Sequence, residues 1–126
     1  MSRRKLFSVV ESPTHPDLAE LYARLGFDET KLSSTRKAMA ELKTRPPDVV
    51  VAEFFYGYGN NYAGVNISNL DVLLFSLQKY APRARVILMV DKSERQYVDK
   101  LNEILPLHAV LLQPVAAAQM EAALRD

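Results

Sequence analysis

The fold of this chain is decided by the stretch RPPDVVVAE, residues 45–53. Its two prolines end any helix that precedes them, because proline lacks the N–H group that a helix interior needs. Val49 to Ala52 form a run too short for a helix, and its residues are apolar at every position rather than at alternate ones. Such a run is typical of a parallel strand that is buried on both faces. We therefore predict a central strand, directly followed by one acidic residue, Glu53.

Strand and helix patterns alternate on both sides of this stretch. The expected strands are residues 6–10, 27–32, 49–52, 85–90 and 109–112. A helix is expected after each of them, with Thr14 and Asp17, Ser68 and Asp71, and Asp91 and Glu94 as capping patterns at three of the starts. The fourth helix carries Tyr97, Leu101 and Ile104, and the last one covers residues 115–124. Five such units predict an α/β fold, with a five-stranded parallel, doubly wound sheet between two helical layers.

Composition limits the classes of protein to which the chain can belong. Its 126 residues are 48% hydrophobic and 25% charged, which suits one globular domain over residues 1–126. The formal net charge of +1 gives no electrostatic reason to expect a nucleic acid as partner. There is no cysteine, no apolar stretch long enough for a membrane span, and no glycine-rich phosphate loop. We expect a cytoplasmic protein without a cofactor.

Four segments together resemble the receiver domains of two-component response regulators. They are LFSVVES (6–12), GFDETKLSSTRKAMAELKTRPPDVVVAE (26–53), YAPRARVILMV (80–90) and AVLLQPV (109–115). The resemblance covers almost the whole chain, and it implies a flavodoxin-like fold and a role in signal transduction. Members of this family bind magnesium with acids at the end of the first strand and accept phosphate on an aspartate that ends the third. The bound phosphate is contacted by two further residues of the family. One is a hydroxyl residue that ends the fourth strand, and the other is a lysine that ends the fifth strand and precedes a proline.

The resemblance implies that the positions of the magnesium-binding acids are Val10 and Glu11, and that the acceptor position is Glu53. The positions of the hydroxyl residue and the lysine are Val90 and Gln113. A single acid offers Mg²⁺ fewer oxygen ligands than an acidic pair. Glu53 is one methylene longer than the aspartate acceptor, which misplaces its oxygen. Val90 has no hydroxyl, and Gln113 has no cationic charge to pair with a phosphate. The resemblance therefore implies a degenerate receiver, a pseudo-receiver that is not an enzyme and does not undergo ordinary phosphorylation.

The carboxylate of Glu53 has two interpretations at this stage. It could reach the place of a phosphoryl group and hold the domain in an activated conformation, or it could be an acid left over from an ancestral site. A rival hypothesis takes Glu11, Glu53 and Asp91 together, since all three fall at carboxyl ends of strands and could converge on a divalent ion. Asp91 already has a sufficient role as a helix cap. We expect no metal site, and keep an atypical phosphoreceiver or metal-dependent phosphotransfer protein as the alternative.

The segment that follows Glu53 is unusual in composition. Residues 54–69 carry no charge, but they contain five of the eleven aromatic residues of the chain and three of its four glycines. Tyrosine with glycine and asparagine is typical of protein-binding surfaces. The candidate contact residues are Phe55, Tyr56, Tyr58, Asn60, Asn61 and Tyr62. The segment could instead fold back as a lid, with Phe54 or Phe55 closing the sheet edge.

The sequence therefore predicts a non-enzymatic signalling module that works by protein–protein contact. Its long segment after the third strand is the candidate contact surface. In receivers, the face made by the fourth helix, the fifth strand and the fifth helix often mediates dimers. The last helix here is rich in small residues that let another backbone approach: Ala116, Ala117, Ala118, Ala122 and Ala123. A homodimer is accordingly a second expected association.

Overall fold

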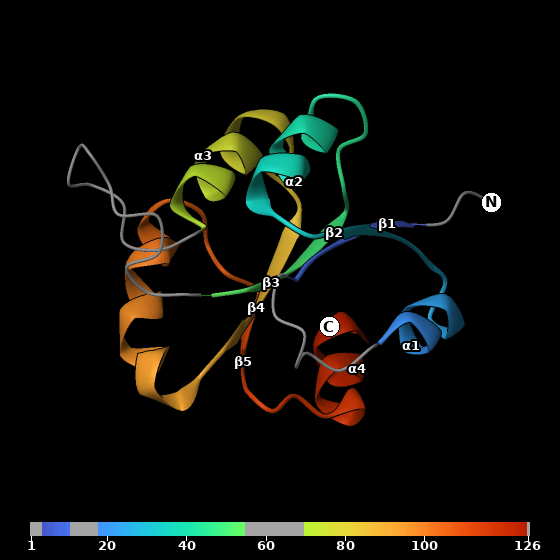
Figure 1. Cartoon of the computed structure of the whole chain (residues 1–126), viewed down its shortest axis with the longest axis vertical. Helices are drawn as coiled ribbons and strands as arrows, with labels where there is room; N and C mark the ends of the chain where they lie inside the picture. Colours follow the sequence, from blue (N-terminus) through green and yellow to red (C-terminus); the bar gives the residue numbers. More distant parts are fainter. Residues whose placement is uncertain (1–3, 11–17, 55–69, 126) are drawn as a thin grey trace.

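The computed structural model describes residues 4–10, 18–54 and 70–125, and these residues form a single sheet with helices around it (Figure 1). The strands are β1 (Arg4–Val9), β2 (Phe27–Leu32), β3 (Val49–Glu53), β4 (Arg85–Val90) and β5 (Ala109–Leu112). The helices are α1 (Ala19–Arg24), α2 (Thr35–Leu42), α3 (Asp71–Tyr80), the 3₁₀ helix η1 (Lys92–Glu103) and α4 (Ala117–Arg125). The predicted alternation of strands and helices is confirmed.

The sheet has the strand order β2-β1-β3-β4-β5, and every neighbouring pair is parallel. The strand predicted to be central, β3, lies in the middle, and all five of its residues are buried. Val49 is in register with Leu6 of β1 and with Arg85 of β4. Because the strands are parallel, their carboxyl ends meet at one edge of the sheet and their amino ends at the other. These are named the carboxyl edge and the amino edge below.

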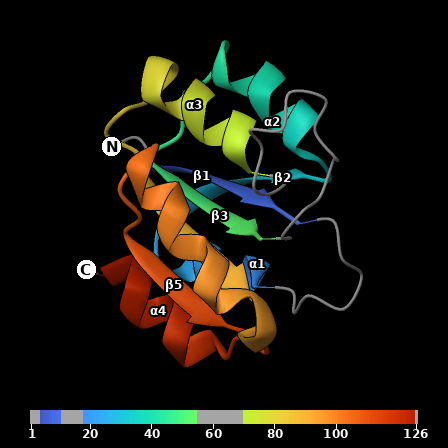
Figure 2. The same cartoon turned by 90° about the vertical axis from the view of Figure 1, so that its left-hand side faces the viewer.

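Two apolar cores lie on opposite faces of the sheet. Successive strand residues point to opposite faces, so Val50 and Ala52 pack in one core while Val49 and Val51 pack in the other. The first core is closed by residues of α2, α3 and η1, and the second by residues of α1 and α4. Figures 1 and 2 show α2 and α3 on one side of the sheet and α1 and α4 on the other. The three layers are those that the sequence predicted.

The predicted capping patterns of the first and third helices are only partly covered by the described residues. Helix α1 begins at Ala19 and α3 at Asp71, and neither has a side-chain cap from its N-cap residue. Three of the four residues of those two patterns, Thr14, Asp17 and Ser68, lie outside the described residues. A cap that sequence analysis did not identify starts α2, where the Ser34 side chain accepts a hydrogen bond from the Lys37 N–H at 3.2 Å.

The helix after β4 has the predicted cap but another geometry. Asp91 is its N-cap, and the segment that follows is a 3₁₀ helix with three residues per turn. Three-residue spacing aligns Val98 and Leu101, and both are fully buried. Tyr97, which the sequence analysis grouped with Leu101 and Ile104, is only half-buried. The described residues contain no helix that is long and apolar enough to cross a membrane.

Candidate functional site at the carboxyl edge of the sheet

Glu53 ends β3 at the carboxyl edge and is only 2% exposed. Its register partner in β4 is Met89, which is completely buried. Alternation along β3 places Glu53 on the same face as Val51, in the core that α1 and α4 close. The acid at the acceptor position is therefore buried rather than presented to solvent.

Val90 lies on the opposite face of the sheet from Met89. It is completely buried, in the core that also holds Leu88 and Phe54. A residue at this position faces the α2 and α3 layer, so even a hydroxyl there would point into the core. By alternation, the next residue, Asp91, is on the side of Glu53. Which face of the sheet a strand residue occupies can be counted from the sequence once the register of the strands is known. The register itself could not be predicted from the sequence.

Asp91 is exposed, and it is engaged as the cap of η1. One carboxylate oxygen accepts a hydrogen bond from the Ser93 N–H at 2.9 Å and a second hydrogen bond from the Ser93 hydroxyl. The hydroxyl and, to a smaller degree, the N–H hold the pKa of the Asp91 carboxyl below its ordinary value of 3.8. The helix cap predicted at this residue is confirmed. Its ionised carboxylate is a fixed negative charge beside the end of β4.

Gln113 follows β5, and its side chain is half-buried. Its backbone N–H donates to the carbonyl of Val90 at 2.9 Å, which ties the carboxyl ends of β4 and β5 together. The peptide bond from Gln113 to Pro114 is cis. The side chain at this place is a neutral amide, so it can donate a hydrogen bond but supplies no charge. The described residues at the ends of β3, β4 and β5 are thus two acids, an aliphatic residue and an amide.

The predicted three-acid metal site cannot be followed in full, because Glu11 lies outside the described residues. Within the described part of the chain, no group of three or more His, Asp or Glu side chains could hold a metal ion. Of the other two acids, Glu53 is buried, and Asp91 directs one oxygen at Ser93. Mg²⁺ prefers near-octahedral oxygen ligands. The two described acids do not provide that set.

The candidate contact residues Phe55, Tyr56, Tyr58, Asn60, Asn61 and Tyr62 also lie outside the described residues. The structure does describe Phe54, the residue that leads into them. Its side chain is 2% exposed and belongs to the core under α2 and α3, and its N–H donates to the Met89 carbonyl at 2.9 Å. Phe54 therefore packs inward, and the residues that would distinguish a lid from a contact surface lie outside the described ones.

The sequence analysis did not identify two apolar side chains that are exposed on α3. Val72 and Phe75 are 47% and 55% exposed, and their three-residue spacing puts them on one side of α3. They lie away from the buried leucine stripe of that helix, and this separation is visible in the sequence as apolar residues outside the helical pattern. Four of the five alanines expected at a dimer face are exposed: Ala116, which directly precedes α4, and Ala117, Ala118 and Ala122 within the helix. Ala123 is buried.

Comparison with known proteins places the fold. No family model and no curated protein sequence matches the chain. Among solved structures, a response regulator receiver domain from Clostridium thermocellum has a TM-score of 0.70 at 17% identity, over 97% of this chain and 91% of that one. The chemotaxis response regulator CheY4 of Vibrio cholerae has a TM-score of 0.71 at 12% identity, over 98% of both chains.

A third solved structure contains a phosphorylated aspartic acid. It is a response regulator from Burkholderia pseudomallei with a phosphorylated aspartic acid and a calcium ion. Its TM-score is 0.71 at 16% identity, over 96% of this chain and 66% of that one. At such low identities the likeness establishes the fold alone. The predicted receiver-like, flavodoxin-like α/β fold is confirmed.

Proposed function

We propose that this protein is a receiver-like signalling domain that does not accept phosphate and acts through protein–protein contact. The observation that carries the proposal is the burial of Glu53, which is 2% exposed at the end of the central strand. An acceptor carboxylate must meet a phosphodonor and a metal ion. At 2% exposure the Glu53 carboxylate is closed to both in this conformation.

The neighbouring strand ends support the same proposal. Phosphoryl transfer spreads negative charge over the oxygens of the transferred group, and that charge must be neutralised by metal ions and cationic side chains. Gln113 offers a neutral amide, and Val90 points into the opposite core. Asp91 adds negative charge, which repels a phosphoryl group. The described residues that end these three strands or directly follow them therefore include no cation, and the nearest one along the chain is Lys92 at the start of η1.

Intact-mass spectrometry tests this part of the proposal. The protein is incubated with Mg²⁺ and acetyl phosphate, and its mass is expected to stay unchanged. A receiver that carries a phosphorylated aspartate, such as the one from Burkholderia pseudomallei, serves as the positive control. The variant Glu53→Gln controls for phosphate on other side chains. An acid-labile phosphoryl adduct that is present in the wild type and absent from Glu53→Gln would overturn the proposal.

The contact surface is proposed at the same carboxyl edge. In open α/β sheets, ligands bind outside the carboxyl ends of the strands, and a fold can keep that geometry while its chemistry changes. The aromatic and amide residues from Phe55 to Tyr62 follow Phe54, whose ring is anchored in the core. Residues that follow a rigid anchor lose less conformational entropy on binding than residues of a free chain.

A homodimer is proposed through the face of η1, β5 and α4. Leu112 of β5 is 41% exposed, and the exposed alanines of α4 allow another backbone to come close. Sedimentation velocity at high micromolar concentration should detect a dimer, and Leu112→Lys should weaken it. A strictly monomeric wild type at that concentration would remove this part of the proposal without affecting the absence of phosphorylation.

A further inference from the structure

The helix that follows β4 keeps one geometry over an unusual length. Helix η1 is a 3₁₀ helix of 12 residues, and its residues are orange in Figures 1 and 2. In a 3₁₀ helix each N–H donates to the carbonyl three residues earlier, with poorer hydrogen-bond geometry than in an α-helix, so runs longer than roughly four residues are uncommon. An α-helix over the same residues is the natural competitor of η1.

The apolar residues of this segment follow the spacing of an α-helix. Positions i, i+1, i+4, i+7 and i+8 form one stripe at about 3.6 residues per turn. These positions hold Tyr97, Val98, Leu101, Ile104 and Leu105. The 3₁₀ geometry buries only part of the stripe: Val98 and Leu101 are completely buried, whereas Tyr97 is half-buried. The sequence pattern therefore favours an α-helix that turns Tyr97 inward as well.

The hydrogen bonds at the end of the helix combine both spacings. The Leu101 carbonyl accepts hydrogen bonds from the Ile104 N–H at 3.0 Å and from the Leu105 N–H at 3.1 Å. The first spans three residues, as in a 3₁₀ helix, and the second spans four, as in an α-helix. Arg95 and Asp99 pair at 3.3 Å, and four residues is also the spacing at which side chains of an α-helix meet. Because nucleation is the costly step of helix formation, an existing four-residue bond favours growth of an α-helix from this end.

The 3₁₀ form is held at both ends. The Asp91 carboxylate caps the first turn through Ser93, and the Gln78 side chain of α3 donates a hydrogen bond to the Ile104 carbonyl. A 3₁₀ helix rises about 2.0 Å per residue and an α-helix about 1.5 Å, so conversion shortens the 12 residues of η1 by about 6 Å. Since the first turn is capped at the end of β4, this shortening moves the Ile104 carbonyl away from Gln78. The contact between Gln78 and Ile104 therefore belongs to the 3₁₀ form.

We propose that η1 is a conformational switch, which exchanges between this 3₁₀ helix and an α-helix whose formation turns Tyr97 toward the core. A partner that contacts the exposed part of the Tyr97 ring selects the 3₁₀ state, because a ligand shifts an equilibrium by its differential affinity for the two states. The proposal does not depend on the chemistry at Glu53 or on the homodimer.

NMR relaxation dispersion on the wild-type protein tests the proposal. Helix rearrangements of this kind take microseconds to milliseconds, the range that the method detects. The amides of residues 92–105 should show exchange, and the Cα chemical shifts of the minor state should be those of an α-helix. NOEs from each Hα to the N–H two residues later should identify the 3₁₀ form as the major state. Absence of exchange in η1 would overturn the proposal, as would a minor state with the chemical shifts of an unfolded chain.

Two variants should shift the two populations in opposite directions. Gln78→Ala should raise the ratio of α-helical to 3₁₀ form about fivefold, the effect of losing one net hydrogen bond. The control is Lys79→Ala, at the neighbouring exposed residue of α3, whose ammonium lies over the Tyr80 ring. It should leave the ratio unchanged. Tyr97→Ser should lower the ratio, because it removes the ring that the α-helix buries while serine and tyrosine have similar helix propensity.

Circular dichroism must show that each variant is folded. If Tyr97→Ser does not fold, the comparison of Gln78→Ala with Lys79→Ala provides the test by itself. Equal ratios in these two variants would overturn the proposal. A folded Tyr97→Ser variant with an unchanged or raised ratio would overturn it as well.

Discussion

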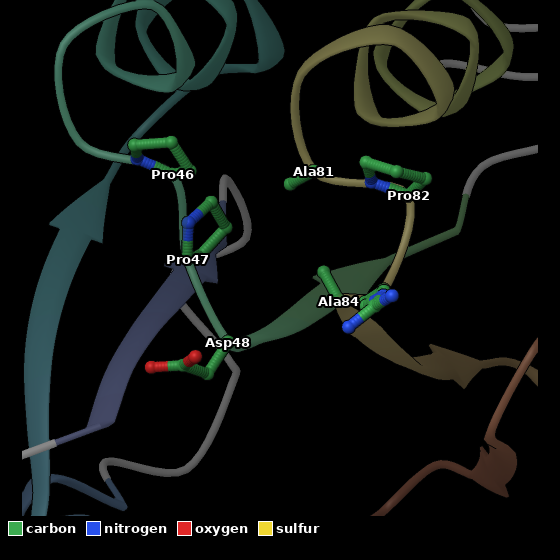
Figure 3. A pocket seen from close by; sticks show the side chains of 7 residues that line it. Pro46, Pro47, Asp48, Ala81, Pro82 and Ala84 are labelled. Atoms are coloured by element: carbon green, nitrogen blue, oxygen red, sulfur yellow. The ribbon is translucent and has the colours of Figure 1, made fainter.

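The carboxyl edge and the amino edge belong to the same parallel sheet but have different chemistry. At the carboxyl edge the described strand ends present a buried Glu53 and the capping carboxylate of Asp91, with the neutral amide of Gln113 beside them. At the amino edge, the segments entering β3 and β4 form an open pocket (Figure 3) whose lining of prolines and alanines also contains one acid, Asp48, and one base, Arg83.

This difference shows that the fold fixes where a ligand can bind, whereas the individual side chains fix which ligand can bind there. The parallel sheet places strand ends at both edges and favours ligands at the carboxyl one. In this molecule the described residues that end β3, β4 and β5 or directly follow them include no cation. Neutral aromatic contact, rather than binding of a phosphoryl group, is therefore expected at the carboxyl edge.

The largest expected effect concerns packing at the carboxyl edge. Phe54→Ala should lower the free energy of unfolding by about 3–5 kcal/mol, because the ring is 2% exposed and its removal leaves a cavity in the core. Phe75→Ala is the matched control: the same residue type, 55% exposed on α3, should change it by about 0.5 kcal/mol or less. Urea unfolding measures both. Equal losses would mean that Phe54 is not an anchor for the residues after it.

The next effect concerns partner affinity at the carboxyl edge. Changing Tyr56, Tyr58 or Tyr62 to serine should each cost about 2 kcal/mol of binding to a partner recovered from the native cell extract, roughly thirtyfold in affinity. Thermal unfolding should stay near that of the wild type. Tyr80→Ser, at the end of α3 near the amino edge, is the control and should keep this partner. Unchanged binding together with a collapsed melting temperature would support a lid rather than a contact surface.

A smaller effect is expected from the cap of η1. The folded-state pKa of Asp91 is depressed, so its contribution to stability is present above the ordinary value of 3.8 and is lost as pH falls through the folded pKa. Asparagine also caps helices but does not ionise in this range. Asp91→Asn should therefore lose less melting temperature than the wild type on acidification to about pH 3. Asp99→Asn in η1 is the control, and identical pH profiles for wild type and Asp91→Asn would contradict the assignment.

The smallest expected effect is the response to divalent metal. A ligand that binds the native state raises stability by RT ln(1 + [L]/Kd), so a protein without a tight site should respond little. Millimolar Mg²⁺ or Mn²⁺ should leave the melting temperature of the wild type nearly unchanged. A clear rise that disappears in Glu11→Gln would favour the three-acid site of Glu11, Glu53 and Asp91. Such a result would also weaken the contrast between the two edges.

The sheet could be predicted because its signals are local. The run from Val49 to Ala52 is apolar at every position, and the alternating strand and helix patterns imply parallel order. The 3₁₀ geometry of η1 could not be predicted, since a spacing of three and one of 3.6 residues both bury Leu101. The helix cap at Asp91 was predicted, because a capping residue acts on its immediate neighbours.

The candidate site was only partly predictable. The place of Glu53 at the end of the central strand follows from the sequence, but its burial depends on Met89, which is 36 positions further on and meets it through the register. The side of Val90 depends on the same register. The pocket at the amino edge joins two segments that are also far apart along the chain, so no local pattern could show it.

The central claim is that the carboxyl edge no longer responds to phosphate, and one measurement tests it most directly. The measurement is an amide NMR spectrum of the protein before and after addition of Mg²⁺ and beryllofluoride, a mimic of the bound phosphoryl group that activates the receiver DrrB, whose structure is similar at a TM-score of 0.73. We predict that the amides of Glu53, Asp91 and Gln113 do not shift. Saturable shifts at these three amides, absent from Glu53→Gln, would contradict the account.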